Sequence, residues 1–369
     1  MITRRRLVTL STLAAAGALA TATKYSSSVA ERGYDTAVRS TWRHTTGNLA
    51  NTHLLQRELV RYATLAPSSH NTQCWKFRLA ENALTILPDL HRRCPVVDPD
   101  DHHLFVSLGC ATENLVQAAR AQGLSAVTNF DPADDGGIRV QLVPAEADRS
   151  PLFEAIPKRQ STRTEYDGNP LANEELKLLE QAGAGKGTHV LLLTSRDLME
   201  QVLEYVVQGN AAQLDDPAFL EEIKTWIRFD DADALRSDDG LFSRTTGNPS
   251  VPRWLGSLLF KRFLNARKEN EKYARHIRSS AGIAIFVSDA SDREHWVESG
   301  RSFQRFALQA TALGIRTAHL NQPVEVAALR PQFSSFLGIG NHRPDLVVRF
   351  GHGPEMPRSL RRPVEAVLV

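Results

Sequence analysis

The sequence is poor in the residues that build metal centres and disulfide frameworks. It contains only three cysteines, Cys74, Cys94 and Cys110, and none of them forms a CxxC pair. The twelve histidines are scattered, and the adjacent His102 and His103 lack the spacing of an HExxH zinc motif. These absences argue against a disulfide framework and against a bound metal. Neither a Ser-His-Asp triad nor an activated cysteine is evident, so we assign no catalytic side chain.

The sequence also lacks an excess of charge of one sign. Its formal net charge is only +2, and the basic residues are dispersed along the 369-residue chain. A protein that binds nucleic acid usually concentrates positive charge on one face, so the sequence predicts no nucleic-acid partner. Beyond the N-terminal region, we expect no stable membrane-spanning segment.

Residues 1–23 have the composition of an export signal. Three arginines at positions 4 to 6 precede an uncharged, Ala- and Leu-rich stretch with the small-residue pattern Ala18-Leu19-Ala20. The pair Arg4-Arg5 favours a signal of the twin-arginine type, and an ordinary secretory signal is the alternative. The twin-arginine pathway moves folded proteins, often with cofactors installed. The signal therefore predicts an exported, periplasmic or extracytoplasmic protein that carries a bound group.

Two segments of the remaining chain repeat each other. Residues 104–130 align without a gap with residues 295–321, so that Gly109 meets Gly300 at an offset of 191 positions. Each copy predicts a helix of about fourteen residues that is closed by a glycine and leads into a strand. A chance likeness of two Ala-rich helices is the alternative. Duplication predicts two α+β domains of similar fold.

About 345 residues follow the signal, which is enough for two domains. We expect a boundary in the Pro- and Asp-rich stretch 144–151, with a first domain over 24–150 and a second over 151–369. The second domain carries an irregular segment from about 217 to 274 that is rich in aromatic residues and proline. This composition favours an ordered, lid-like insertion, and two surface helices joined by a loop are the alternative.

The segment 66–77 is the best candidate for a ligand-binding loop. It reads APSSHNTQCWKF and follows an apolar-periodic stretch that predicts a helix ended by Pro67. Hydroxyls, an imidazole and carboxamides occupy neighbouring positions, which suits hydrogen bonding to a polar, flat or anionic ligand. A solvated turn with ordinary caps is the alternative.

Two basic clusters complete the set of motifs. Arg159 and Arg163 lie four residues apart with Ser161 between them, and this pattern suits a phosphate because arginine offers forked donors. The other cluster lies near the C-terminus and comprises Arg358, Arg361 and Arg362. A solvated positive face is the alternative for each cluster.

These motifs together resemble the nitroreductase family, whose members are α+β flavoproteins that bind FMN at a homodimer interface. Ala66–Phe77 resembles its APSSxNxQPWxF segment, and Arg159–Arg163 resembles its RxSxR segment. Gly314–Gln322 and the pair Arg361-Arg362 are similar to its flavin-edge loop and C-terminal basic pair. After the signal, the whole chain is more similar to the fused, pseudo-dimeric (Acg-type) branch. The resemblance implies a tandem pair of nitroreductase-like domains that forms an intramolecular pseudo-dimer.

The resemblance implies FMN as the cofactor, held in one composite site per chain, because each copy lacks one half of the motif pair. It assigns cofactor binding to residues from four segments: Pro67, Ser68, Asn71 and Gln73; Arg159, Gln160, Ser161 and Arg163; His319, Leu320, Asn321 and Gln322; and Arg361 and Arg362. His70 is a weaker extension of this set. Cys74 stands where the family has proline, and we expect it to be a buried structural cysteine.

The function implied by the resemblance is that of an FMN-dependent oxidoreductase whose chemistry takes place at flavin N5. Its partners would be a small-molecule electron acceptor and an unidentified donor, because an exported protein meets little nicotinamide cofactor. The expected oligomeric state is a monomer containing the pseudo-dimer. Two alternatives stay open: an FMN-sequestering protein with little or no turnover, and a structural exported protein without flavin.

Overall fold

The computed structural model describes residues 28–46, 49 and 51–369. The predicted export signal lies outside the described residues. The described chain begins with a helix over residues 28–41. Among the described helices, none combines the length and the apolar character that crossing a bilayer needs.

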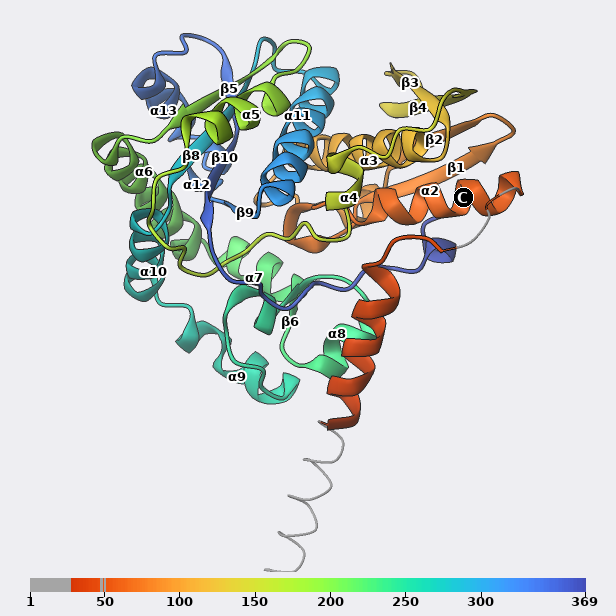
Figure 1. The fold of residues 1–369 in the computed structure, drawn as a ribbon. Helices are drawn as coiled ribbons and strands as arrows, with labels where there is room; N and C mark the ends of the chain where they lie inside the picture. Colours follow the sequence, from red (N-terminus) through yellow and green to blue (C-terminus); the bar gives the residue numbers. More distant parts are fainter. Residues whose placement is uncertain (1–27, 47–48, 50) are drawn as a thin grey trace, which may run out of the picture.

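Two four-stranded sheets of identical topology organise the described chain (Figure 1). The first has the strand order β1-β2-β4-β3 and the second has the order β5-β8-β10-β9, with antiparallel neighbours throughout. The strands of the first sheet are β1 (Trp75–Ala80), β2 (Ala83–Pro88), β3 (Leu124–Asp131) and β4 (Gly137–Pro144). Those of the second are β5 (Thr188–Leu193), β8 (Gly282–Ser288), β9 (Ile315–His319) and β10 (Arg343–His352). The predicted tandem α+β class is therefore confirmed.

The helix predicted in each copy is present and longer than expected. These helices are α3 (His102–Ala121) and α11 (Arg293–Ala312), of 20 residues each, and they lie between the two sheets (Figure 1). After each helix the chain turns into its strand at a glycine, Gly123 or Gly314, and both glycines have a φ of 76°. A side chain at this left-handed φ would be strained, which explains the glycine in both copies.

The matched glycines Gly109 and Gly300 lie where α3 and α11 cross. A Cβ atom on Gly109 would lie 2.0 Å from the carbonyl oxygen of Val297, and one on Gly300 would lie 2.0 Å from that of Val106. Val106 and Val297 are themselves 191 positions apart, as the two glycines are. The contact is therefore reciprocal, as a pseudo-twofold axis between the two copies requires.

The two halves of the chain, which contain one sheet each and which we call the two copies, differ mainly in the segment between their first and second strands. Two residues join β1 to β2, whereas a helical segment over residues 196–278 joins β5 to β8 and contains the predicted insertion. This segment comprises α6 (Arg196–Asp215), α7 (Pro217–Trp226), β6 (Ile227–Arg228), α8 (Asp231–Ser237), β7 (Leu241–Phe242), α9 (Arg253–Phe263) and α10 (Ala266–Arg278). We call it the helical insertion.

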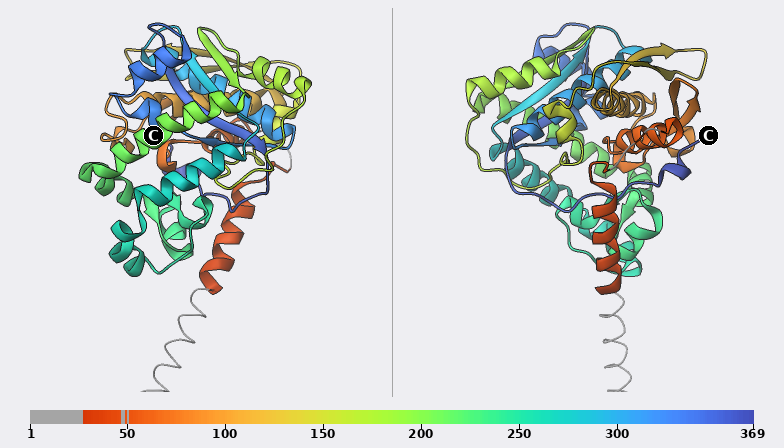
Figure 2. Two further views of the ribbon diagram at one scale, coloured as in Figure 1. Left: turned by 90° about the vertical axis from the view of Figure 1, so that its left-hand side faces the viewer. Right: turned by 45° about the vertical axis from the view of Figure 1, so that its right-hand side comes forward.

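The remaining helices flank the sheets or link them. They are α2 (Thr52–Thr64), which packs on α3; α4 (Pro151–Ala155), which packs on α11 and α3; α5 (Asn173–Gly183) beside the second sheet; and α12 (Gln322–Glu325) and α13 (Arg330–Leu337), which follow β9 and precede β10. The C-terminal segment returns to the first copy (Figure 2). There Phe77 donates its N–H to Val367 at 2.8 Å and accepts from Val369 at 3.0 Å. Residues far apart in sequence thus meet beside α2.

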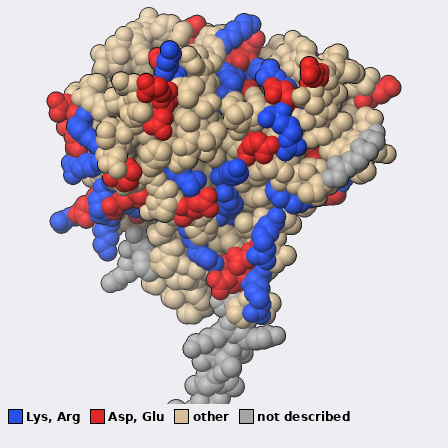
Figure 3. All heavy atoms as spheres, in the orientation of Figure 1, with Lys and Arg blue, Asp and Glu red and all other residues tan. Residues whose placement is uncertain are grey.

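The surface carries a mixed charge. On the face drawn in Figure 3, acidic and basic side chains are interspersed, and neither sign forms a broad field. Many of these charges form exposed pairs, such as Arg278 with Glu200 at 2.8 Å. Pairs of this kind contribute about 0–1 kcal/mol each, so the fold depends chiefly on its apolar core.

Candidate functional site

Two adjoining hollows lie between the two copies, and residues of the helical insertion form part of the wall of each. The larger, which we call the main cavity, encloses about 250 Å³, and the smaller encloses about 50 Å³. Their walls share Pro67, Ser68, Arg163 and Leu241. We call the smaller one the arginine hollow, because four guanidinium-bearing residues line it: Arg159, Arg163, Arg358 and Arg361.

The predicted loop after α2 forms the wall shared by both hollows. Three of its residues, His70, Asn71 and Gln73, adopt left-handed φ angles of 49°, 53° and 54°. Each such conformation costs about 1–2 kcal/mol in a non-glycine residue, so contacts must hold the loop. Asn71 supplies them by donating to Gly240 at 3.1 Å and accepting from Arg361 at 2.9 Å.

The second predicted motif is held against the edge of β9. The N–H of Thr162 donates to Thr317 at 2.9 Å, which sets the segment beside the end of β9 at His319. From this segment, Arg159 reaches the end of α2 and donates from Nη2 to the carbonyl of Leu65 at 3.3 Å. The structure therefore brings the polar loop and the arginine motif together, although about 90 residues separate them.

The arginine hollow carries positive charge that the described protein does not neutralise. Arg159 is 2% exposed, and its buried Nε and Nη1 atoms have no hydrogen-bond partner. Within the described residues, none of the four arginines forms an ion pair with a carboxylate. Burial lowers the pKa of Arg159 to about 10, and the nearby Arg358 and Arg163 contribute to the shift. Such an arrangement calls for an anion.

Arg361 is the best-anchored member of this group. Its guanidinium donates to the carbonyls of Thr64 at 2.7 Å and Ala66 at 3.1 Å, which are left open where α2 ends. Burial lowers its pKa well below the ordinary value, and the neighbouring charge of Arg159 acts in the same direction. Arg361 therefore both caps α2 and adds charge to the hollow.

The main cavity is lined by polar groups that are buried without partners. The unpaired atoms are Nε2 of His70, Nδ1 of His319 and Oε1 of Gln322. Gln322 donates from Nε2 to the hydroxyl of Tyr273 at 2.6 Å, so the Tyr273 proton is free to point elsewhere. Burial lowers the pKa of His70 to about 4, and the imidazole is neutral at pH 7. The cavity thus offers neutral donors and acceptors beside a cationic hollow.

We expect the ligand-free protein to lose stability on acidification partly through His319. Burial, together with Arg163, His103 and Arg159, lowers its pKa from the ordinary 6.5 to about 3. The unfolded chain therefore binds more protons between these values, and stability falls as the pH drops through this range. From pH 6.5 to pH 5, the wild type should lose about 2 kcal/mol more unfolding free energy than His319→Gln. Urea unfolding at both pH values measures this difference.

The exposed His53 provides the matched control for this comparison. His53→Gln should show the same pH dependence as the wild type. If the unfolding free energy of His319→Gln shows the same pH dependence as that of the wild type, the His319 imidazole is not buried in the wild-type protein in the way described.

The sequence-predicted residues divide into two groups by position. Eleven line one or both hollows: Pro67, Ser68, Asn71, Arg159, Gln160, Ser161, Arg163, His319, Asn321, Gln322 and Arg361. Gln73, Leu320 and Arg362 lie outside both walls. Gln73 is fully buried and links Asp238 to the N–H of Arg362, whereas Leu320 packs in the apolar core. Cys74 is buried as expected, with a pKa raised to about 12 by burial.

Several lining residues have no signal in the sequence. Tyr273 and Leu241 come from the helical insertion, and Trp42 comes from the N-terminal region. Glu325 follows the predicted edge loop, where burial raises its pKa and Gln213 donates to it at 2.6 Å. Aromatic, aliphatic and acidic residues recur throughout the chain, so only the fold identifies these four.

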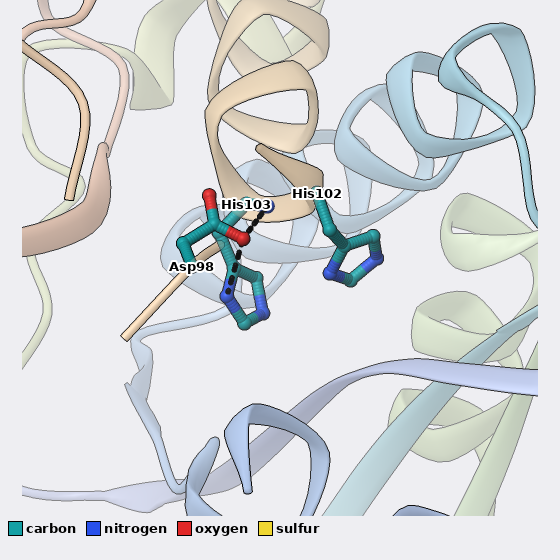
Figure 4. Close-up of side chains that lie close together, drawn as sticks. All are labelled: Asp98, His102 and His103. Atoms are coloured by element: carbon teal, nitrogen blue, oxygen red, sulfur yellow. Dashed lines mark hydrogen bonds and ion pairs between the residues drawn. The ribbon is translucent and has the colours of Figure 1, made fainter. Parts of the chain in front are cut away.

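A cluster of Asp98, His102 and His103 beside the main cavity has the composition of a metal site (Figure 4). The Asp98 carboxylate accepts the backbone N–H groups of His103 at 3.0 Å and Leu104 at 2.9 Å, as a cap for the start of α3 does. The His102 ring points Nε2 away from Asp98 and pairs through this atom with Asp345 at 2.8 Å, whereas its buried Nδ1 has no hydrogen-bond partner among the described residues. We interpret the cluster as a helix cap and a buried His–Asp pair.

No family model matches this chain. Two proteins of Mycobacterium tuberculosis, from strains CDC 1551 / Oshkosh and H37Rv, are each 28% identical to it over 337 residues. The similarity covers 86% of this chain and 93% of each relative, and both are named for a proposed NAD(P)H nitroreductase activity.

Solved structures provide a weaker comparison. A nitroreductase of Bacteroides fragilis with bound FMN is 16% identical and has a TM-score of 0.34, covering 55% of this chain and 88% of that one. An FMN-dependent nitroreductase of Mycobacterium smegmatis in complex with NADPH is 15% identical, with a TM-score of 0.37, and covers 59% of this chain and 91% of that one.

Proposed function

We propose that this protein is an exported, FMN-binding oxidoreductase of the nitroreductase family. The observation that carries the proposal is the arginine hollow, where Arg159 is buried with two unpaired nitrogens and, among the described residues, no carboxylate pairs with the four arginines. A phosphate monoester has the charge and the acceptor oxygens that this group needs. The similarity to two mycobacterial proteins named for nitroreductase activity supports the same assignment.

The residues present fit FMN in two adjoining parts. Arg159 and Ser161 would hold the phosphate in the arginine hollow. Arg361 would add positive charge there, because its N–H groups already donate to protein acceptors, and Arg163 stands where the two hollows meet. In the main cavity, the neutral His319 and Gln322 would hydrogen-bond the polar edge of the ring. FMN supplies hydride chemistry when it is bound, and the protein contributes binding, orientation and exclusion of water.

We further propose that each chain has one such site, because the pseudo-symmetric position is filled by Arg301. At the offset of 191, Cys110 and His319 of the site correspond to Arg301 and Thr128. Arg301 donates to Thr128 at 3.0 Å and pairs with Glu113 at 3.3 Å. Among the described residues, a guanidinium and its partners occupy this position, which supports a single site.

An FMN-sequestering role is the second candidate, and the helical insertion favours it. Phe219, Leu241 and Tyr273 of the insertion line the main cavity, so the insertion forms part of its wall. A covered site of this kind would retain a flavin while admitting few substrates. For the oxidoreductase, the electron donor would be other than a nicotinamide cofactor, given the predicted export signal. In either role, the protein would act as a monomer in the periplasm.

Absorbance spectroscopy and reoxidation test these proposals in sequence. We expect the ligand-free protein to bind one FMN per chain in a spectral titration, and the absence of binding would overturn the proposal. A stoichiometry of two would contradict the single composite site. The reduced, FMN-loaded protein is then mixed without oxygen with a nitroaromatic compound or a quinone. Reoxidation faster than in buffer supports the enzyme, and reoxidation no faster supports sequestration.

A further inference from the structure

The N-terminal region, which lies outside the predicted motifs, supplies a wall of the arginine hollow. Trp42 lines this hollow together with residues of the polar loop and of the C-terminal segment. The guanidinium carbons of Arg358 and Arg361 lie 5.2 and 4.8 Å from the centre of the indole ring. Both arginines are in cation–π range, so one aromatic ring contacts two of the four positive charges.

The helix that precedes Trp42 is fastened over the same place. The Tyr34 hydroxyl donates to the carbonyl of Arg358, and the indole Nε1 of Trp42 donates to Ser359 at 2.9 Å. Tyr34 also packs with Phe242 and Leu360 in a small buried cluster of its own. The helix over residues 28–41 therefore lies across the C-terminal segment that carries the arginines (Figures 1 and 2).

This arrangement has a specific consequence for an anion in the hollow. Arginine side chains attract a phosphate more strongly when water is excluded from them. Trp42 excludes water from one side of Arg358 and Arg361 without introducing a negative charge. If the indole were removed, the guanidinium groups of Arg358 and Arg361 would keep their positive charge but would become hydrated.

We propose that residues 28–46 form a strap over the phosphate end of the cofactor site, with Trp42 as its closing residue. The proposal rests on the proposed function, since it takes the ligand to be FMN. Trp42 is a positioning residue, because it acts through Arg358 and Arg361. It strengthens recognition of the phosphate group and leaves recognition of the ring unchanged.

Titration calorimetry of the flavin-free protein with FMN and with riboflavin tests the strap. Trp42→Ala should raise the FMN dissociation constant about tenfold, because the hydrated guanidinium groups of Arg358 and Arg361 attract the phosphate less strongly. Its affinity for riboflavin, which lacks the phosphate, should equal that of the wild type. Trp42→Phe keeps an aromatic face and should restore most of the FMN affinity.

Two further variants separate the strap from general effects. Tyr34→Phe removes the bond to Arg358 at a residue that does not line the hollow. It should weaken FMN binding about two- to threefold, because the strap is then held less firmly over Arg358. Trp254→Ala is the matched control, because Trp254 is 70% exposed on α9 and should leave both affinities unchanged.

The outcomes distinguish the strap from the function on which it rests. If Trp42→Ala binds FMN as tightly as the wild type, or loses riboflavin affinity to the same extent, the strap is overturned while FMN binding stands. If the wild type binds neither FMN nor riboflavin, the proposed function is contradicted, and with it the strap that rests on it.

Discussion

Arg159→Met is expected to weaken FMN binding about 100-fold and at the same time to stabilise the flavin-free protein. Charge-assisted hydrogen bonds contribute about 1.5–3 kcal/mol each, and Arg159 has two unpaired nitrogens available for a phosphate. Without a ligand, the same buried charge is uncompensated and costs folding energy. Replacing a buried charge by an apolar side chain of similar volume often stabilises by about 1–4 kcal/mol, and we expect about 1–2 kcal/mol here.

Arg305→Met is the matched control for this variant. Arg305 pairs at 3.1 Å with Glu113, which is 2% exposed, and it also donates to the carbonyl of Ala184 at 2.9 Å. Its loss leaves a buried carboxylate with fewer partners, so Arg305→Met should destabilise the protein and leave FMN affinity unchanged. The two variants are thus expected to move stability in opposite directions.

Urea unfolding without flavin and calorimetric titration with FMN measure both effects. Unchanged FMN affinity in Arg159→Met would remove this residue from the site. A loss of stability like that of Arg305→Met would show instead that the guanidinium has a structural role. Higher stability of the flavin-free protein together with weaker FMN binding is the result expected for a residue that serves ligand binding at a cost in stability.

The repeat could be predicted because helix packing constrains sequence locally. Gly109 and Gly300 are required by a close helix crossing, and Gly123 and Gly314 by a left-handed φ, so both pairs recur at one offset. The insertion, in contrast, follows no period, and its contribution to the cavity depends on how the chain returns from β5 to β8.

The site was predictable by segment more readily than by side chain. Arginine motifs and polar loops indicate which segments bind a polar or anionic ligand. The direction in which each side chain points depends on the backbone conformation, which the motif does not specify. At the end of β9, neighbouring side chains point to opposite sides, so His319 and Asn321 line the cavity while Leu320 enters the core. Trp42 could not be predicted, because it reaches the hollow only when the N-terminal helix meets the C-terminal segment.

Gly109→Ala and Gly300→Ala are expected to destabilise the protein by about 3 kcal/mol or more each. In either variant the new methyl group would lie 2.0 Å from a backbone carbonyl oxygen of the facing helix, so α3 and α11 must separate. Because alanine favours the helix over glycine by about 1 kcal/mol, the measured loss of unfolding free energy is the cost of the clash minus this gain. Thermal and urea unfolding measure both variants.

Gly314→Ala is the control for these variants, because only its φ of 76° is unfavourable. Apart from its chain neighbours, no described residue has a heavy atom within 4 Å of the added Cβ. This variant should cost about 1 kcal/mol. Nearly neutral effects at Gly109 and Gly300 would contradict the close crossing.

The two crossing variants should nevertheless differ in ligand binding. Gly300→Ala displaces Val106, which lines the main cavity, whereas Gly109→Ala displaces Val297, which lies outside its walls. At temperatures where both remain folded, Gly300→Ala should therefore weaken FMN binding more than Gly109→Ala. Equal losses of stability with unequal losses of affinity are the result expected when a symmetric helix pair supports a single, asymmetric site.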